Sequence, residues 1–196
     1  MVSFQLLTAQ TKPESFYNYN FQQISKEEFD SISRQKGYLY NQYNLEDQII
    51  NILFQSKTRG KLKQEQLDSL KTQLNKIEPL KGEHIVIIYY PGKDKCNETK
   101  QNSTWNIFDR DYKKYIENLA DSNQFWIYNN DDNLEYYYPR KYNWTKDENQ
   151  YIEKLFFKMH YPCASSTVID KDGNFISNLG EFGKQHVIQD IIELKK

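Results

Sequence analysis

The sequence of 196 residues lacks an excess of charge of either sign, because 27 acidic residues balance 26 basic ones and leave a formal net charge of −1. Such a balance, with the charges interspersed, does not favour binding to nucleic acid or to an anionic membrane surface. No stretch approaches the roughly 20 consecutive apolar residues of a membrane-spanning helix. Cysteine occurs only twice. The chain therefore has the composition of an ordinary solvated protein, long enough for one sizeable core or for a domain with an appendage.

Several sequence motifs of catalysis and cofactor binding are also missing. The chain has no glycine-rich phosphate loop, no Gly-x-Ser-x-Gly elbow and no His-Glu-x-x-His zinc motif. The acidic pairs Asp131-Asp132 and Asp170-x-Asp172 lie in turn-forming stretches without the spacing of a calcium-binding EF-hand. We therefore assign no cofactor.

The first ten residues are similar to the end of a secretory signal peptide. An apolar run leads to Thr8-Ala9-Gln10, which is a plausible cleavage site. The segment lacks the basic start of a signal, and its apolar part is shorter than the usual stretch of about 7–15 residues. Two interpretations stay open, a truncated signal over 1–10 or a frayed terminus. The first implies an extracytoplasmic protein, periplasmic or secreted, and the second allows a cytoplasmic one.

Residues 11–82 carry mostly helical patterns. Ser25 and Glu28 have the spacing of a capping box at the start of a helix. Further on, apolar residues recur at every third or fourth position, which is typical of an amphipathic helix. Together these patterns predict a helix after Ser25, helices over 45–54 and 62–77, and a short strand over 21–24. We therefore expect a mostly helical N-terminal region ahead of a second domain that begins at residue 83.

The second domain is organised around residues 84–90, His-Ile-Val-Ile-Ile-Tyr-Tyr, which have the composition of a strand buried on both faces. The loop after such a strand is where open α/β sheets bind their ligands, and here it contains Cys96. The patterns that follow predict helices over 111–120, over 148–159 and from 184, strands over 124–128, 166–170 and 174–179, and a hairpin turn at 171–173. We expect 84–90 and 124–128 to form a parallel pair, because a crossover helix joins them, and 166–170 and 174–179 to be antiparallel to each other, because a tight turn joins them.

This β-α-β-α-β-β-α order resembles the thioredoxin-like superfamily, and most closely the periplasmic redoxins that reduce or rearrange disulfides. The residues that carry the resemblance are the segment 82–90, Tyr161-Pro162, the segment 166–173, Gly180 and the final helix. The resemblance implies a thioredoxin-like α/β sandwich over 83–196, with 11–82 as its helical N-terminal extension. It also implies that Pro162 lies in the structural loop beside the site.

The chain departs from this family at the active site. The family carries a Cys-x-x-Cys motif at the start of the first crossover helix. Here Cys96 stands alone, with Lys93 three residues before it and Thr99 three residues after it. A competent dithiol oxidoreductase is therefore not expected.

The topology that the resemblance implies relates Cys96 to Cys163. Strand 84–90 would be central, parallel to 124–128 on one side and antiparallel to 166–170 on the other. The loop that enters 166–170 would therefore lie beside the loop that leaves 84–90. Three alternatives stay open: a Cys96–Cys163 disulfide, two free structural thiols, or a redox role for both residues. Export would favour the disulfide, because an oxidising compartment preserves such bonds.

The most direct expectation is a non-catalytic module with a structural or interaction role, whose partner the sequence does not name. One alternative is a thiol-disulfide redox protein that uses Cys96 and Cys163. Another is a copper carrier, because His160, Cys163 and Cys96 are ligand types that suit copper or zinc. We assign no residue as a metal ligand.

Overall fold

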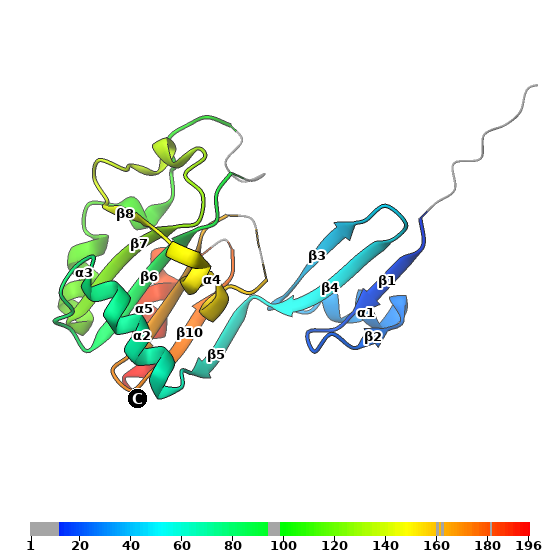
Figure 1. Ribbon diagram of the computed structural model, residues 1–196, viewed down its shortest axis with the longest axis horizontal. Coiled ribbons are helices and arrows are strands. Elements are labelled where there is room, and N and C mark those ends of the chain that lie inside the picture. The colour runs from blue at the N-terminus through cyan, green and yellow to red at the C-terminus, as the bar shows by residue number, and fades with distance from the viewer. Residues whose placement is uncertain (1–11, 94–98, 160, 162, 181) are drawn as a thin grey trace, which may run out of the picture. The chain divides into compact units, whose positions relative to one another are not determined.

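The computed structural model describes residues 12–93, 99–159, 161, 163–180 and 182–196 (Figure 1). The chain forms two compact units, Met1–Gln55 and Ser56–Lys196. Both contain a mixed β-sheet with helices, so the α/β class is confirmed. The boundary lies well before the predicted one at residue 83, because the segment 57–82 belongs to the second unit.

The first unit is a four-stranded sheet with one helix. Its elements are β1 (Glu14–Tyr17), β2 (Gln23–Ile24), α1 (Lys26–Ser33), β3 (Tyr38–Asn44) and β4 (Ile49–Gln55), and the strand order is β2-β1-β4-β3. Helix α1 begins at the predicted cap, where the Ser25 hydroxyl accepts a hydrogen bond from the Glu28 amide at 3.2 Å. The buried Phe29 ring of α1 lies 5.1 Å from the Phe16 ring and 5.5 Å from the Tyr40 ring. Helix α1 therefore covers one face of this sheet.

The predicted helix over 45–54 is wrong, because this segment contains strand β4. Strand β4 pairs with β1 on one side and β3 on the other, so it is an inner strand with apolar residues on both faces. A largely apolar run of this kind, interrupted only by Asn51, satisfies helical spacing as well as strand spacing. The prediction of a mostly helical region over 11–82 is not confirmed either: its described part forms five strands and two helices.

The second unit is built on a six-stranded sheet with the strand order β5-β10-β9-β6-β7-β8. Its elements are β5 (Lys57–Lys61), α2 (Gln64–Asn75), β6 (His84–Tyr90), η1 (Asn106–Phe108), α3 (Tyr112–Ala120), β7 (Ser122–Tyr128), η2 (Leu134–Tyr137), β8 (Trp144–Lys146), η3 (Glu148–Gln150), α4 (Tyr151–Phe156), β9 (Ser165–Asp170), β10 (Asn174–Asn178) and α5 (Lys184–Leu194), where η marks a 3₁₀ turn. Strand β6 is parallel to β7 and antiparallel to β9, and all seven of its residues are buried. The predicted central strand and both of its neighbours are thus confirmed.

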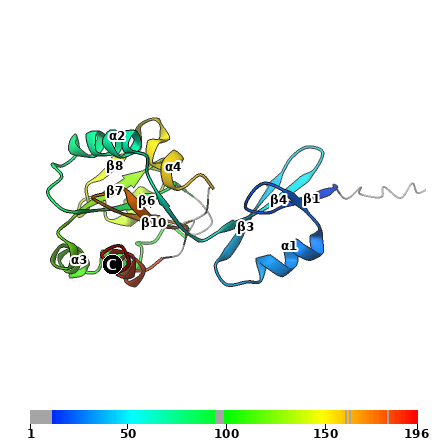
Figure 2. The same cartoon turned by 90° about the horizontal axis from the view of Figure 1, so that it is seen from below.

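Helices cover both faces of this sheet, with α2 and α4 on one face and α3 and α5 on the other (Figure 2). The side chains of β6 alternate between the two layers. Val86 and Ile88 join the apolar cluster under α3 and α5, whereas the Tyr89 ring lies on the opposite face and stacks on the Phe157 ring at 4.8 Å. This double coverage is why residues 84–90 are almost uniformly apolar.

The predicted hairpin between β9 and β10 is confirmed. Asp170 organises the turn, because its Oδ1 accepts hydrogen bonds from the amides of Asp172 and Asn174, each at 2.9 Å. Gly173 has φ = +84°, which favours glycine at this position. The turn brings β10 back beside β9, and β10 in turn pairs with the edge strand β5.

Candidate binding pocket beside Cys163

Four connecting segments meet at one end of the six-stranded sheet, where β6 ends. Tyr89 of β6 pairs with Ser165, so β9 starts beside the carboxyl end of β6. Ser166 pairs with Asn178, so β10 ends at the same edge. The segments that follow β6, β7 and β10, together with the residues just before β9, therefore lie together. This arrangement was predicted for the segments after β6 and before β9.

A pocket of about 300 Å³ lies among these segments. Its described lining is mostly apolar and aromatic: Ser103, Trp105, Tyr137, Cys163, Ala164 and Phe182. Each of the four segments contributes at least one of these residues. Such a composition suits an apolar group of a ligand rather than a charged one.

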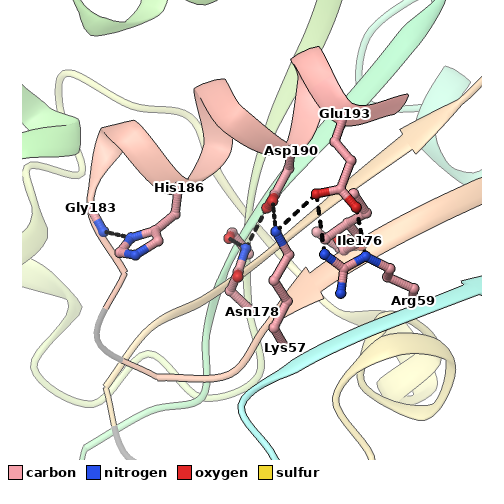
Figure 3. A network of polar contacts seen from close by, with 10 residues as sticks. Lys57, Arg59, Ile176, Asn178, Gly183, His186, Asp190 and Glu193 are labelled. Atoms are coloured by element: carbon pink, nitrogen blue, oxygen red, sulfur yellow. Dashed lines mark hydrogen bonds and ion pairs between the residues drawn. The ribbon is translucent and has the colours of Figure 1, made fainter. Parts of the chain in front are cut away.

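Trp105 and Phe182 form a rigid wall of the pocket. The indole Nε1–H of Trp105 donates to the carbonyl oxygen of Phe182 at 2.5 Å, and the two rings are 4.7 Å apart in an edge-to-face arrangement. The first turn of α5 holds Phe182 in place, because the Lys184 amide donates to Asn106 Oδ1 at 2.9 Å. The amide of Gly183 also donates to His186 Nδ1 at 3.0 Å (Figure 3). Hydrogen bonds from the segment between β6 and α3 and from the start of α5 therefore both hold this wall in place.

Cys163 contributes its side chain to the pocket and is disulfide-bonded. Its φ of +72° lies in the left-handed region, which is unusual for a residue other than glycine. Cys96 and Pro162 lie outside the described residues. The predicted Cys96–Cys163 pairing and the structural role of Pro162 in the adjoining loop therefore stay predictions.

The metal hypothesis rested on His160, Cys163 and Cys96. His160 also lies outside the described residues. Within the described ranges, no three histidine, cysteine, aspartate or glutamate side chains gather closely enough to hold a metal ion. The copper-carrier alternative gains no support from the part of the site that the structure describes.

A second group of polar side chains joins β5, β10 and α5 (Figure 3). Lys57 Nζ lies 2.6 Å from Asp190 Oδ1 and 3.4 Å from Glu193 Oε2, and Arg59 Nε donates to Glu193 Oε1 at 2.6 Å. Asn178 Nδ2 donates to the other oxygen of Asp190 at 2.5 Å. This network attaches the edge strand β5 to helix α5, and the Asp190 side chain is only 1% exposed. We assign it a structural role.

The surroundings of these carboxyl groups shift their pKa values in opposite directions. Burial raises the pKa of Asp190 above its ordinary value, although the Lys57 ammonium and the Asn178 amide oppose the shift. The Arg59 guanidinium lowers the pKa of the exposed Glu193.

Asp147 is a further buried carboxyl group. Burial raises its pKa, and its two oxygens accept the amides of Ile152 and Glu153 at the start of α4, each at 3.0 Å.

Trp105 and Phe182 were not predicted from the sequence to be site residues. Trp105 follows a polar stretch in the connection after β6, and Phe182 lies shortly before α5. Neither belongs to a periodic pattern, so no helix or strand rule assigns them to a core. A large aromatic residue in the connection that follows the buried central strand is the signal that could have found Trp105, whereas Phe182 follows β10 and carries no such signal. Tyr137 belongs to a run of three tyrosines, 136–138, and packs at 4.8 Å against the Tyr90 ring.

No protein-family model, no curated protein and no solved structure matches this chain. Of the helices in the described ranges, none has both the length and the apolar character needed to cross a bilayer.

Proposed function

We propose that residues 83–196 form a thioredoxin-like domain that binds a protein partner and does not catalyse thiol-disulfide turnover. The strand order β7-β6-β9-β10 supports the thioredoxin-like assignment, with β6 parallel to β7 and antiparallel to β9. The order of elements, β6-α3-β7-α4-β9-β10-α5, is the β-α-β-α-β-β-α order of the resemblance. Strand β8 and the turns η2 and η3 are additions between β7 and α4.

The observation that carries the binding function is the apolar pocket beside the oxidised Cys163. The described lining offers no imidazole or carboxylate to move a proton, and the Ser103 hydroxyl accepts the amide of Trp105 at 3.1 Å. A pocket of about 300 Å³ with a fixed aromatic wall suits one aromatic or aliphatic side chain of a partner. We therefore assign binding of an apolar anchor residue to this pocket.

The lack of turnover follows from the cysteine spacing. A dithiol reductase needs a second thiol close in sequence and space, which expels the partner from a mixed disulfide. Residues 93 and 99, where that thiol would stand relative to Cys96, are lysine and threonine. A redox function of Cys96 with Cys163 is the second candidate, since Cys163 is oxidised.

Peptide selection tests the binding function. A displayed library of short linear peptides is selected against the whole oxidised protein, and the affinities of the selected peptides are then measured. We expect aromatic or aliphatic anchors, and about tenfold or greater loss of affinity in Trp105→Ala and in Ser103→Phe, which fills the pocket. Tyr115→Ala is the matched control, because Tyr115 is 53% exposed on α3. Peptides that bind both pocket variants as tightly as wild type would refute the assignment.

Export is part of the proposal, and the disulfide at Cys163 supports it, because cytosolic reductants keep most thiols reduced. Residues 1–10 lie outside the described residues. We expect protein isolated from its native host to begin near Gln10. A native protein that begins at Met1 or Val2 in the cytoplasmic fraction would contradict export.

A further inference from the structure

A second and larger hollow lies on the α2 and α4 face of the six-stranded sheet. It has a volume of about 470 Å³, within the range of about 300–1,000 Å³ that is usual for small-molecule sites. Its walls come from the end of α2, from strand β8 and from the turn η3, with β7 and α4 beneath. We call it the α2–β8 groove. Among the described residues, it shares no lining residue with the pocket beside Cys163.

The floor of the α2–β8 groove is aliphatic. It consists of Leu74 from α2, Ile127 from β7 and Ile152 from α4, and Ile77, just beyond the end of α2, continues it. Leu74, Ile127 and Ile152 are almost completely buried, so the floor is part of the packed core, whereas Ile77 is 41% exposed and lies at the opening. None of the described lining residues is aromatic. The floor therefore suits a flexible aliphatic chain, and it offers no ring on which a nucleobase could stack.

The charged groups at the rim favour an anion. Lys76, directly after α2, and Lys146 of β8 line the groove from segments that are far apart in the sequence, and among the described residues neither forms an ion pair. Two carboxylates, Asp147 and Glu148, also line it. Asp147 is buried, and both of its oxygens accept the amides of Ile152 and Glu153 at the start of α4, so they are not available to a ligand cation. The exposed charges of the described lining are then two ammonium groups and one carboxylate, that of Glu148.

From this floor and rim we infer that the α2–β8 groove is a binding site for an amphipathic aliphatic carboxylate, a ligand with a fatty-acid-like chain and one anionic head. The chain lies on Leu74, Ile77, Ile127 and Ile152, and the carboxylate lies between Lys76 and Lys146. This site is independent of the partner-binding pocket.

Titration calorimetry of the whole protein with decanoate tests the inference, at concentrations at which decanoate stays monomeric. Decanol and decylammonium serve as the uncharged and the cationic probes with the same chain. We expect saturable binding of one decanoate per chain and about tenfold weaker binding of either other probe. Lys76→Glu and Lys146→Glu should each weaken decanoate binding by about tenfold. Lys114→Glu, the same charge change at an exposed position on α3, should leave it unchanged.

Ile77→Gln tests the apolar contact at the opening without adding charge or disturbing the core, because Ile77 is partly exposed in wild type. We expect this variant to stay folded and to lose decanoate binding. Absence of saturable binding to wild type, equal affinity for the three probes, or unchanged binding in Ile77→Gln and both rim variants would each overturn the inference.

Discussion

Asp190 combines a buried carboxyl group with an ion pair to a side chain that is one-third exposed. Its side chain is 1% exposed, and that of Lys57 is 32% exposed. Burial outweighs the ion pair, so the pKa of Asp190 in the folded protein is raised above its ordinary value near 3.8. The folded protein therefore holds the Asp190 proton more tightly than the unfolded chain does.

The sign of the resulting pH dependence can be tested. The contribution of Asp190 to the free energy of unfolding is fully present below about pH 3.8 and is lost as the pH rises through the folded-state pKa. We expect the difference in unfolding free energy between wild type and Asp190→Asn to fall as the pH rises from 3.8, and then to become constant. Urea unfolding at a series of pH values measures it, with Asp172→Asn as an exposed control. A difference that rises with pH would show that the ion pair dominates instead.

Ile87 is the residue that tests the burial of the central strand. It has no exposed surface and lies in the middle of β6. Ile87→Asp would place a carboxylate there without a partner, which we expect to cost more than about 4 kcal/mol of unfolding free energy. Ile192→Asp, the same substitution at a position of α5 that is 43% exposed, should cost much less. Equal losses in the two variants, measured by urea unfolding, would mean that β6 is not a buried strand.

At the scale of elements, the edge strand β5 depends on the network beneath α5. Lys57→Ala leaves the buried Asp190 without its cation, so we expect a loss of about 2–3 kcal/mol, below the 3–5 kcal/mol of a fully buried pair. Arg59→Ala removes only the exposed pair with Glu193 and should cost roughly 0–1 kcal/mol. Amide hydrogen exchange in β5 should therefore accelerate in Lys57→Ala much more than in Arg59→Ala. Equal acceleration would mean that Asp190 does not secure this strand.

The elements that the sequence predicts best are those whose periodicity has only one interpretation. The helices α2, α3 and α5 and the hairpin between β9 and β10 follow from amphipathic spacing and turn chemistry. Helix α4 is shorter than expected, because Asn149 and Gln150 adopt left-handed φ values of +58° and +54° before it. Strands β4 and β5 were missed for different reasons. Apolar residues occupy both faces of β4, and β5 is a polar edge strand whose side chains are satisfied by distant residues of α5.

At the scale of the whole molecule, the topology was more predictable than the site. The parallel pairing of β6 with β7 follows from the order of elements and from the handedness of crossovers. The place of β9 beside β6, and with it the meeting of the segments after β6 and before β9, was expected only from the resemblance of this order to a known superfamily. The aromatic wall of the pocket could not be predicted, because Trp105 and Phe182 meet only after the β6–α3 and β10–α5 segments fold together. The boundary between the two units after Gln55 could not be predicted either, because only Ser56 separates β4 from β5.

The most direct test of the proposed function is a disulfide-reduction assay. A model protein disulfide is offered to wild type, Cys96→Ser and Cys163→Ser, with a thioredoxin-type system as the electron donor. A binding module without vicinal thiols should show only the background rate in all three proteins. Sustained turnover by wild type that is lost in either cysteine variant would contradict the account and establish the protein as a thiol-disulfide oxidoreductase.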